Sequence, residues 1–217
     1  MATILREWSY RYQWLYDSVS ALAALSVGGT AKFRRLFLRD LTITPEMRVL
    51  DLCCGSGQAT EILVQYSHHV TGLDASPFAI ARAKQNVPQA EYVVAFAEAM
   101  PFPDAQFDLV ITSTALHEMQ SDRLRQILQE VARVLKPGGC FCAIDFHTPT
   151  NWLFWPPLAL FLLLFETETA WQLLQTDLNM LFKAVGLEVS HAYLYAGGSL
   201  QVVQAIKPDA CADGLPS

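Results

Sequence analysis

The sequence predicts a single α/β domain: a seven-stranded, mostly parallel sheet with helices on both faces and a terminal antiparallel hairpin. Short apolar runs alternate with amphipathic stretches from about residue 48 to residue 146, as strands joined by crossover helices do. Near the end of the chain, two strand-like runs are joined by AGG, a turn signal. The 217 residues, 52% of them apolar, suffice for one substantial core.

Five strands and their connecting helices are expected in the first two thirds of the chain. The expected strands are RVLDLCC, HVTGLDAS, EYVVAFA, FDLVITSTA and CFCAIDF. The expected helices are QATEILVQYS, PFAIARAKQN and SDRLRQILQEVARVL, the last with a Ser121 cap and a KPGG stop. Open parallel sheets bind ligands at the carboxyl ends of their strands, so the loops after these strands should form the site.

The remainder of the chain predicts a helix over about 170–185, ended by Gly186, and then the strands VSHAYLY and SLQVVQAIK. We expect one domain with four parts: an N-terminal cap (1–40), a core (41–146), an apolar lid (151–170) and a C-terminal helix and hairpin (171–207).

The apolar run WLFWPPLALFLLLF covers residues 152–165. It is shorter than the about 20 residues of a membrane-spanning helix, and Pro156 and Pro157 limit a helix to the part after them. Two interpretations stay open: a buried helix, or a lid that contacts a lipid-like substrate or a membrane surface. Trp152 and Trp155, ahead of the apolar segment, keep the second one open.

Charge and the start of the chain narrow the class of protein. The net charge of -6 argues against a general nucleic-acid binder, whose affinity comes from clustered Lys and Arg. The start MATILREWSYRYQW lacks the apolar segment of a secretory signal. We therefore expect a cytoplasmic protein with reduced thiols, with peripheral membrane contact as an alternative, and the sequence does not fix the oligomeric state.

The stretch VLDLCCGSGQAT joins a strand to a glycine turn and a helix start. Gly55 and Gly57 let the backbone approach a ligand closely, and the helix start offers free N–H groups. Asp74 ends the next strand, about 20 residues on, as expected of an acid that binds ribose hydroxyls. Thr60 stands where a dinucleotide-binding turn has its third glycine, which disfavours a nicotinamide dehydrogenase. A nucleotide or nucleoside ligand is predicted.

The cysteines predict no metal site. Adjacent strand residues point to opposite faces, so Cys53 and Cys54 should not share a metal ion. Cys140 and Cys142 share one face of a predicted interior strand, where free cysteine behaves as a small hydrophobe.

Four stretches in order, VLDLCCGSGQAT, VTGLDAS, AMPFPDAQFDLVITSTALHE and RVLKPGG, resemble the motifs of class I S-adenosylmethionine-dependent methyltransferases. The resemblance covers about 48–146. It implies a Rossmann-like fold with an antiparallel last strand, S-adenosyl-L-methionine as the cofactor and S-adenosyl-L-homocysteine as the product.

Two looser stretches are similar to the ubiquinone/menaquinone C-methyltransferases: WLYDSVSALAALSVGGTAKFRR, and the run from TAWQLLQTDL to AGGSLQVVQAIK. This second resemblance implies a small-molecule acceptor, a prenylated quinol or another aromatic compound. The alternatives are a methyltransferase for an unrelated small molecule and a non-catalytic S-adenosylmethionine-binding protein.

The resemblance also implies roles for individual residues in binding the cofactor. Asp51, Gly55 and Gly57 would line the methionine and ribose portion of the cofactor. Asp74 would hold the ribose hydroxyls, and Ala75 would pack on the adenine.

The remaining implied positions include two departures from the family pattern. Ala97 would offer its backbone N–H to the adenine ring, and Ser113 would lie by the methionine end. Phe96 replaces the usual aspartate before Ala97, so Glu98 or a backbone carbonyl would accept from the adenine amino group. Cys53 replaces the first glycine of the turn and cannot take a positive φ as cheaply.

His117 follows the fourth strand in STALHEM, where the acceptor should meet the methyl group. One interpretation is a loop histidine bonded to backbone. The other is a general base with a pKa suited to neutral pH, biased by Glu118. Deprotonating a quinol hydroxyl makes the ring carbon more nucleophilic, so we expect His117 to be the base, with His147 as a second candidate.

Overall fold

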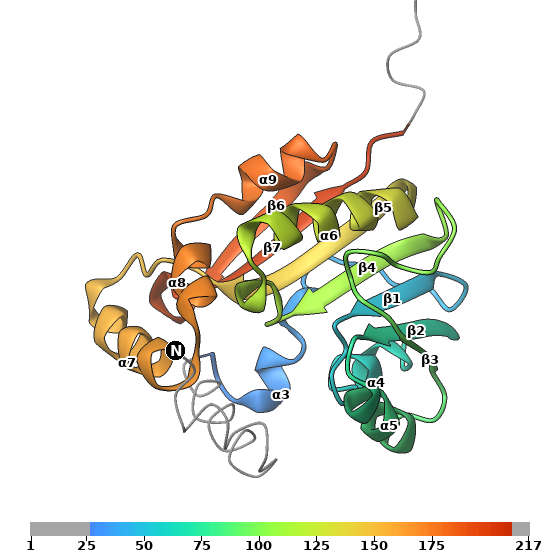
Figure 1. The fold of residues 1–217 in the computed structure, drawn as a ribbon, viewed down its shortest axis with the longest axis horizontal. Coiled ribbons are helices and arrows are strands. Elements are labelled where there is room, and N and C mark those ends of the chain that lie inside the picture. Colours follow the sequence, from blue (N-terminus) through green and yellow to red (C-terminus); the bar gives the residue numbers. More distant parts are fainter. Residues whose placement is uncertain (1–26, 210–217) are drawn as a thin grey trace, which may run out of the picture.

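The computed structural model describes residues 27–209, which form a seven-stranded sheet flanked by helices (Figure 1). The strand order is β3-β2-β1-β4-β5-β7-β6. The first five strands are parallel, and β7 pairs antiparallel with both β5 and β6. The predicted fold class, with its terminal hairpin, is confirmed. The strands are β1 (Arg48–Leu52), β2 (His69–Asp74), β3 (Glu91–Val94), β4 (Phe107–Ser113), β5 (Leu135–Phe146), β6 (Glu188–Tyr195) and β7 (Leu200–Ile206).

Helices cover both faces of the sheet, and neighbouring residues of one strand pack into different layers. Phe141 of β5 packs on the α9 side, where its ring centroid lies 5.2 Å from that of Phe182. Cys142, the next residue, packs with Phe37 and Leu63 on the other face. The helices are α3 (Thr30–Phe33), α4 (Thr60–Leu63), α5 (Pro77–Asn86), α6 (Ser121–Val134), α7 (Trp155–Phe165), α8 (Glu168–Leu174) and α9 (Leu178–Ala184), with the 3₁₀ turns η1 (Leu36–Leu38), η2 (Leu116–Glu118), η3 (Trp152–Phe154) and η4 (Ala196–Gly198).

The strand order places the site. β1 pairs with β2 on one side and with β4 on the other: the chain runs outward from β1 through β2 to β3 and then crosses back to β4 on the far side of β1. Ligands of open α/β sheets bind at such a point, outside the carboxyl ends of the strands. The loops after β1, β2, β3 and β4 meet there.

The C-terminal half corrects one predicted element. The helix expected over about 170–185 is two helices, α8 and α9. The side chain of Asp177 accepts hydrogen bonds from the N–H groups of Asn179 and Met180 and so caps a new helix start. Gly186, with a φ of 81°, follows the end of α9 as predicted.

Three smaller predictions also need correction. Ser121 is the first residue of α6 rather than its cap: Gln120 holds the cap position, with no side-chain cap bond. α6 ends at Val134, just before KPGG as predicted, but β5 begins at Leu135 rather than Cys140 and includes KPGG; its pairing with β4 shifts register between Phe107 and Leu109. α4 is only four residues long, because Gln65 and Tyr66 continue it with the tighter i→i−3 hydrogen bonds.

The apolar run is neither a buried helix nor a fully exposed one. α7 buries Leu158 and Leu162, while Leu160 and Leu163 are 57% and 65% exposed. Within residues 27–209, no helix is long and apolar enough to cross a membrane. Most of the predicted N-terminal cap lies outside the described residues.

Candidate active site

The turn over residues 53–57 leaves β1 with three positive φ angles. Cys53, Gly55 and Gly57 have φ values of 59°, 54° and 90°. Cys53 thus adopts the conformation that the resemblance assigns to a glycine, at a cost of about 1 kcal/mol. Cys54 N–H donates to the Leu73 carbonyl (3.0 Å), and Gly57 N–H donates to the Cys54 carbonyl (2.9 Å). The glycine turn therefore persists although its first position is cysteine.

Asp74 ties three loops together at the carboxyl edge. Its Oδ2 accepts the N–H of Gly55 at 2.9 Å, and its Oδ1 accepts the N–H of Ser76 at 2.9 Å. Its carbonyl oxygen accepts the N–H of Ala95, after β3, at 3.1 Å. A carboxylate offers about four lone-pair positions, so the half-buried Asp74 keeps capacity for hydroxyl donors from a ligand.

Asp51 is a buried carboxylate inside β1. Thr60, the first residue of α4, donates its hydroxyl to Asp51 Oδ2 at 2.5 Å. Burial raises the pKa of Asp51 to about 7, while the hydrogen bonds from Thr60 oppose the rise. Thr60, which stands where a dinucleotide-binding turn has its third glycine, therefore serves as the hydrogen-bond partner of the buried Asp51 carboxylate beneath the turn.

Cys54 and Gly72 pack together behind the turn. A Cβ on Gly72 would lie 2.8 Å from ring carbons of Tyr92 and 2.9 Å from Cys54 Sγ. Cys54 is buried, and burial raises the pKa of its thiol far above the usual range. The two adjacent cysteines have separate structural parts: Cys53 makes the turn and Cys54 fills the space beside β2.

The positions expected around an adenine lie on the loops after β2 and β3. Ala75 is exposed and Ala97 is buried. Phe96 is 62% exposed, so its ring replaces the family's aspartate without supplying an acceptor. Glu98 is half-buried, 3.8 Å from Arg123, and is a carboxylate within this loop.

The electrostatic field around the turn is negative. The pKa of Cys53 is raised to about 12, first by burial and then by the carboxylates of Asp74, Asp51, Glu118 and Glu98. Four acidic side chains thus act on one thiol. S-adenosylmethionine carries a sulfonium and an ammonium group, and an acidic surround of this kind favours such cations. The residues present therefore fit the cofactor that the resemblance implies.

The loop after β4 carries the predicted acceptor side of the site. Ser113 is half-buried at the end of β4. Thr114, with a φ of 52°, turns the chain and donates its hydroxyl to the Ser113 carbonyl at 2.8 Å. η2 follows and carries His117, which is 4% exposed.

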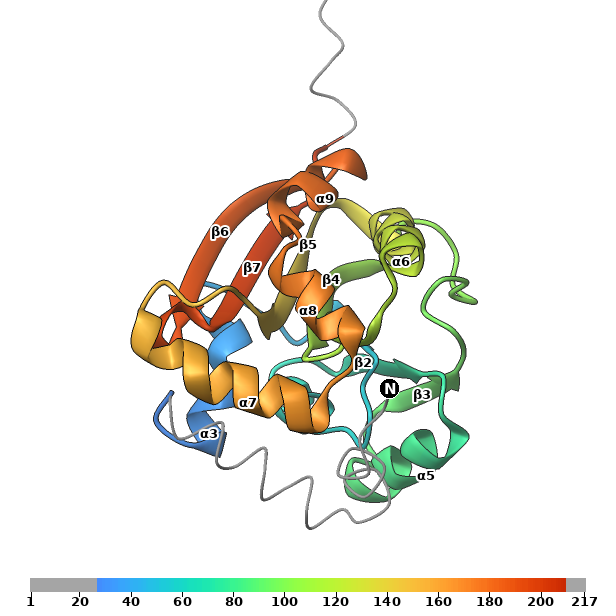
Figure 2. The ribbon, with the colours of Figure 1, turned by 60° about the vertical axis from the view of Figure 1, so that its left-hand side comes forward.

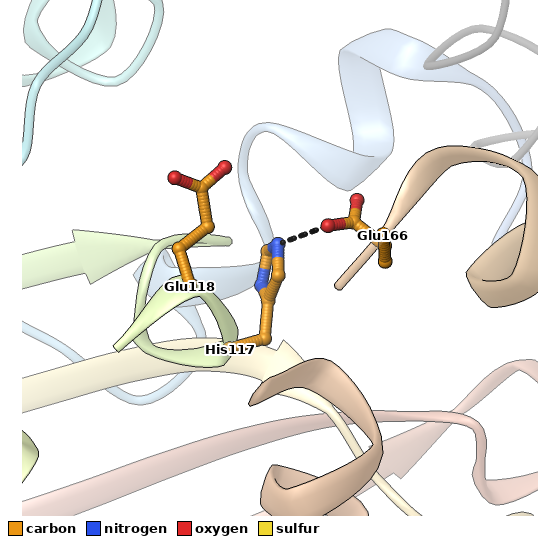
Figure 3. A group of neighbouring side chains, drawn as sticks. All are labelled: His117, Glu118 and Glu166. Atoms are coloured by element: carbon orange, nitrogen blue, oxygen red, sulfur yellow. Dashed lines mark ion pairs between the residues drawn. The ribbon is translucent and has the colours of Figure 1, made fainter. Parts of the chain in front are cut away.

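His117 is held between the carboxylates of Asp145 and Glu166, and Figure 3 shows its pair with Glu166. Its Nδ1 lies 2.7 Å from Asp145 Oδ1, and its backbone N–H donates to Asp145 Oδ2 at 3.2 Å. Its Nε2 lies 3.4 Å from Glu166 Oε2, on the segment between α7 and α8. Asp145 fixes the ring from β5, and Glu166 reaches the other ring nitrogen from the lid.

These partners decide the charge of His117. Burial alone would lower its pKa, but Asp145 and Glu166 outweigh that effect and raise the pKa to about 10. The imidazole is therefore protonated at neutral pH, and the expectation of a pKa suited to neutral pH is not met. The carboxylates with the largest effect are Asp145 and Glu166, rather than the neighbouring Glu118.

The same region contains a group of side chains that could hold a metal ion. Ligand atoms of His117, Glu118 and Glu166 lie within 4.8 Å of one another. Neighbouring ligands of a tetrahedral zinc ion lie roughly 3.4 Å apart, so the group would have to contract. An ion bound to His117 Nε2 would also break the pair with Glu166.

The other histidines of these segments either lie at the opposite edge of the sheet or are hydrogen-bonded to a backbone carbonyl. His147 Nδ1 lies 2.8 Å from the Gly198 carbonyl. His68 and His69 are exposed at the start of β2, at the opposite edge of the sheet.

The sequence analysis missed two side chains of the site, Asp145 and Glu166, and it did not foresee that Thr60 pairs with Asp51. A signal for Asp145 exists, because it is the lone acid near the end of the apolar strand CFCAIDF, as Asp51 is in RVLDL. Glu166 is the first charged residue after the apolar run 152–165.

Comparison with known proteins identifies a family of methyltransferases. A family model described as a methyltransferase domain matches residues 49–139. An uncharacterized methyltransferase of Synechocystis sp. is 60% identical over 205 residues, covering 94% of this chain and 97% of that protein.

Two more distant likenesses cover less or show only the fold. A demethylmenaquinone methyltransferase of Renibacterium salmoninarum is 33% identical over 126 residues, 58% of this chain and 52% of that protein. This chain thus spans about half the length of that relative. The structure of a SAM-dependent methyltransferase from Aquifex aeolicus has a TM-score of 0.61 at 20% identity and covers 80% of this chain and 89% of that one.

Proposed function

Since the chain belongs to the S-adenosylmethionine-dependent methyltransferases, we propose that it methylates a lipophilic quinol or a related aromatic acceptor. The observation that carries the proposal is the contact between His117, at the carboxyl edge of the sheet, and Glu166, at the end of the apolar lid helix. Glu166 follows directly after α7 and pairs with His117, so the apolar helix ends at the site.

When bound, the cofactor supplies an activated methyl group, and the protein supplies position and alignment. Asp74 would hold the ribose hydroxyls, and the turn over residues 53–57 would approach the rest of the cofactor. Asp51 beneath the turn and Ser113 after β4 would border the methionine end. Ala75, Ala97 and Glu98 would surround the adenine.

The acceptor would be activated by the unit of His117, Asp145 and Glu166. His117 is protonated at rest, so the proton of a ring hydroxyl would go to the Glu166 carboxylate. The imidazolium, fixed by Asp145, would then donate from Nε2 to the phenolate oxygen that forms. In this proposal His117 stabilises the phenolate as a hydrogen-bond donor, and Glu166 accepts the proton of the ring hydroxyl.

Two observations support a lipophilic acceptor. A prenyl tail needs an apolar surface next to the site, and α7 has one. Relatives named demethylmenaquinone methyltransferases match this chain at 30–36% identity over parts of its length.

The test compares two acceptors that share a ring and differ in the tail. Reduced demethylmenaquinone and reduced 1,4-naphthoquinone are each incubated with S-adenosylmethionine, and methylated products are measured by mass spectrometry. We expect the prenylated compound to be methylated and kcat/KM for the tail-less compound to be at least about tenfold lower. Equal rates would remove the lipophilic part of the proposal, and methylation of neither would count against a quinol acceptor.

A second candidate function is cofactor binding without catalysis. The resting protonation of His117 favours it, because a protonated imidazole cannot itself accept a proton. Tight cofactor binding with no transfer to any quinol, catechol or amine acceptor would support this alternative.

A further inference from the structure

The lid presents an uncharged face to solvent. No charged residue occurs over residues 152–165. In η3, Trp152 is 74% exposed and Leu153 is 58% exposed. In α7, Leu160 and Leu163 lie three residues apart, on one side of the helix, and are 57% and 65% exposed. We name these four residues, together with the 37%-exposed Trp155, the apolar face.

A basic groove lies on another segment of the described chain. It has a volume of about 560 Å³ and is lined by Lys32, Arg35 and Arg39, with Tyr195 at its wall. All three cationic residues are exposed. The guanidinium of Arg39 is held in place, 4.0 Å from the ring centroid of Tyr193 and hydrogen-bonded to the Tyr195 hydroxyl at 3.2 Å; the carboxylate of Asp40, 3.6 Å from Arg39 Nε, offsets part of its charge, so Lys32 and Arg35 supply most of the positive charge of the groove.

The concentration of positive charge there contrasts with the rest of the chain. Four of the 15 Lys and Arg residues fall within residues 32–39, although the net charge of the chain is -6. A local positive region on an acidic protein attracts anionic surfaces selectively, since the remainder of the molecule is repelled by them.

The apolar face and the basic groove are joined through η4. The Phe154 ring lies directly against Gly197, where a Cβ would be 2.1 Å from Phe154 Cδ2. The N–H of Asn151 donates to the Gly197 carbonyl at 2.9 Å. Tyr195, the wall of the groove, immediately precedes η4. Figures 1 and 2 both show α3, which carries Lys32, and α7 on the same side of the molecule.

We propose that the apolar face and the basic groove together dock the protein on an anionic phospholipid bilayer. The apolar face would lie in the headgroup and acyl boundary, and the basic groove would bind lipid phosphates. An apolar segment with tryptophans at its start, beside basic residues, has the composition of an interfacial anchor. A protein partner would find few polar groups on the apolar face with which to fix its orientation.

Docking would bring the reacting edge to its acceptor. Glu166 lies at the end of α7, so a helix resting in the boundary would hold the acceptor side of the site next to the lipid. This consequence rests on the proposed function, but the docking itself does not, and it can be measured without any acceptor.

The test is co-sedimentation of the full chain with vesicles of phosphatidylcholine, with and without phosphatidylglycerol. We expect strong binding only to the anionic vesicles, weakened by added salt. Lys32→Gln and Arg35→Gln should each lower the partition coefficient about fivefold. Leu160→Gln and Leu163→Gln should each lower it about tenfold.

Matched controls use the same substitutions elsewhere. Arg125→Gln on α6 removes an exposed charge, and Met180→Gln on α9 removes a 71%-exposed apolar side chain. Both should bind vesicles as the wild type does. Cofactor affinity, measured by calorimetry, shows that each variant is folded. Glycerol 1-phosphate is added as a soluble competitor and should not displace the protein, because it lacks the acyl boundary.

Equal binding to neutral and anionic vesicles would overturn the proposal, as would binding unaffected by the four substitutions. Displacement by glycerol phosphate would show a soluble phosphate site instead of a docking surface. Cofactor binding without vesicle binding would overturn the docking proposal and leave the proposed methyl transfer untouched. Vesicle binding without methyl transfer would overturn the proposed function and leave the docking proposal untouched.

Discussion

The two halves of the site are built in different ways. The proposed cofactor half is local: the turn over residues 53–57, Thr60 and Asp74 lie within 22 residues of chain and are held by hydrogen bonds within this stretch and to Asp51. The proposed acceptor half is non-local: Asp145 reaches His117 from 28 residues away along the chain, and Glu166 joins them from the lid. A reading of short motifs can find the first half, whereas only the fold assembles the second.

The division predicts that the two halves can be disabled separately, with the largest effect expected at His117. His117→Gln removes the imidazolium donor while keeping a polar side chain. Turnover with reduced demethylmenaquinone should fall by about 10²–10⁴, with cofactor affinity unchanged within about twofold. His147→Gln is the control and should keep its turnover, because His147 is bound to the Gly198 carbonyl. Loss of cofactor affinity in His117→Gln would contradict the independence of the two halves of the site.

The second prediction concerns pH and the cofactor half. The pKa of Asp51 is raised to about 7, so below that pH its carboxyl is neutral in the folded protein. A cationic cofactor favours the ionised form, so its affinity should rise with pH by up to about tenfold per unit and level off above about pH 7. Calorimetry at several pH values checks this.

Asp51→Asn provides the comparison, since asparagine does not titrate. Its cofactor affinity should not vary across the same pH range. A wild-type affinity that is equally flat would mean that the charge of Asp51 is not linked to cofactor binding.

The third prediction concerns stability and the other end of the pH scale. His117 has a folded-state pKa raised to about 10 above its usual value of 6.5. A raised folded-state pKa contributes stability that is fully present below the unfolded-state pKa and is lost as pH rises through the folded one. The free energy of unfolding, measured by urea titration, should therefore fall between about pH 7 and pH 10 in the wild type. The fall should be smaller in His117→Gln, and equal slopes would contradict the buried ion pairs.

The fourth prediction concerns packing behind the turn. Gly72→Ala forces a Cβ within 2.8 Å of the Tyr92 ring and should lower the free energy of unfolding by about 1–3 kcal/mol. Adding Tyr92→Leu should recover part of the loss, because it removes the ring. Urea denaturation measures both, and an unchanged Gly72→Ala would show that the strand and ring can move apart freely.

The smallest effect separates the adjacent cysteines. Cys53→Gly relieves a positive φ and should raise the free energy of unfolding by about 0.5 kcal/mol. Cys54→Gly empties a buried position and should lower it by about 1–2 kcal/mol. If both substitutions changed the free energy of unfolding in the same direction, the different structural roles assigned to Cys53 and Cys54 would be contradicted.

The features that could be predicted from the sequence are the local ones, and the features that could not are those that depend on contacts between distant segments. The sheet, its hairpin and the cofactor turn were predictable, because hydrophobic periodicity, turn residues and the spacing from Gly55 to Asp74 are local signals. The pairing of His117 with Asp145 was not, because it depends on β4 and β5 lying side by side. The split of the helix at Asp177 was missed because a side-chain cap competes with a continuous apolar pattern.

The most direct test of the account is a calorimetric titration with S-adenosylmethionine and S-adenosylhomocysteine, with wild type, Asp74→Ala and the surface control Asp122→Ala side by side. Asp74 joins the loops after β1 and β2 and is the expected ribose ligand. We predict micromolar binding of both compounds to the wild type and to Asp122→Ala, weakened at least about a hundredfold in Asp74→Ala. Unchanged binding in Asp74→Ala, or no binding to the wild type, would contradict the cofactor site described here.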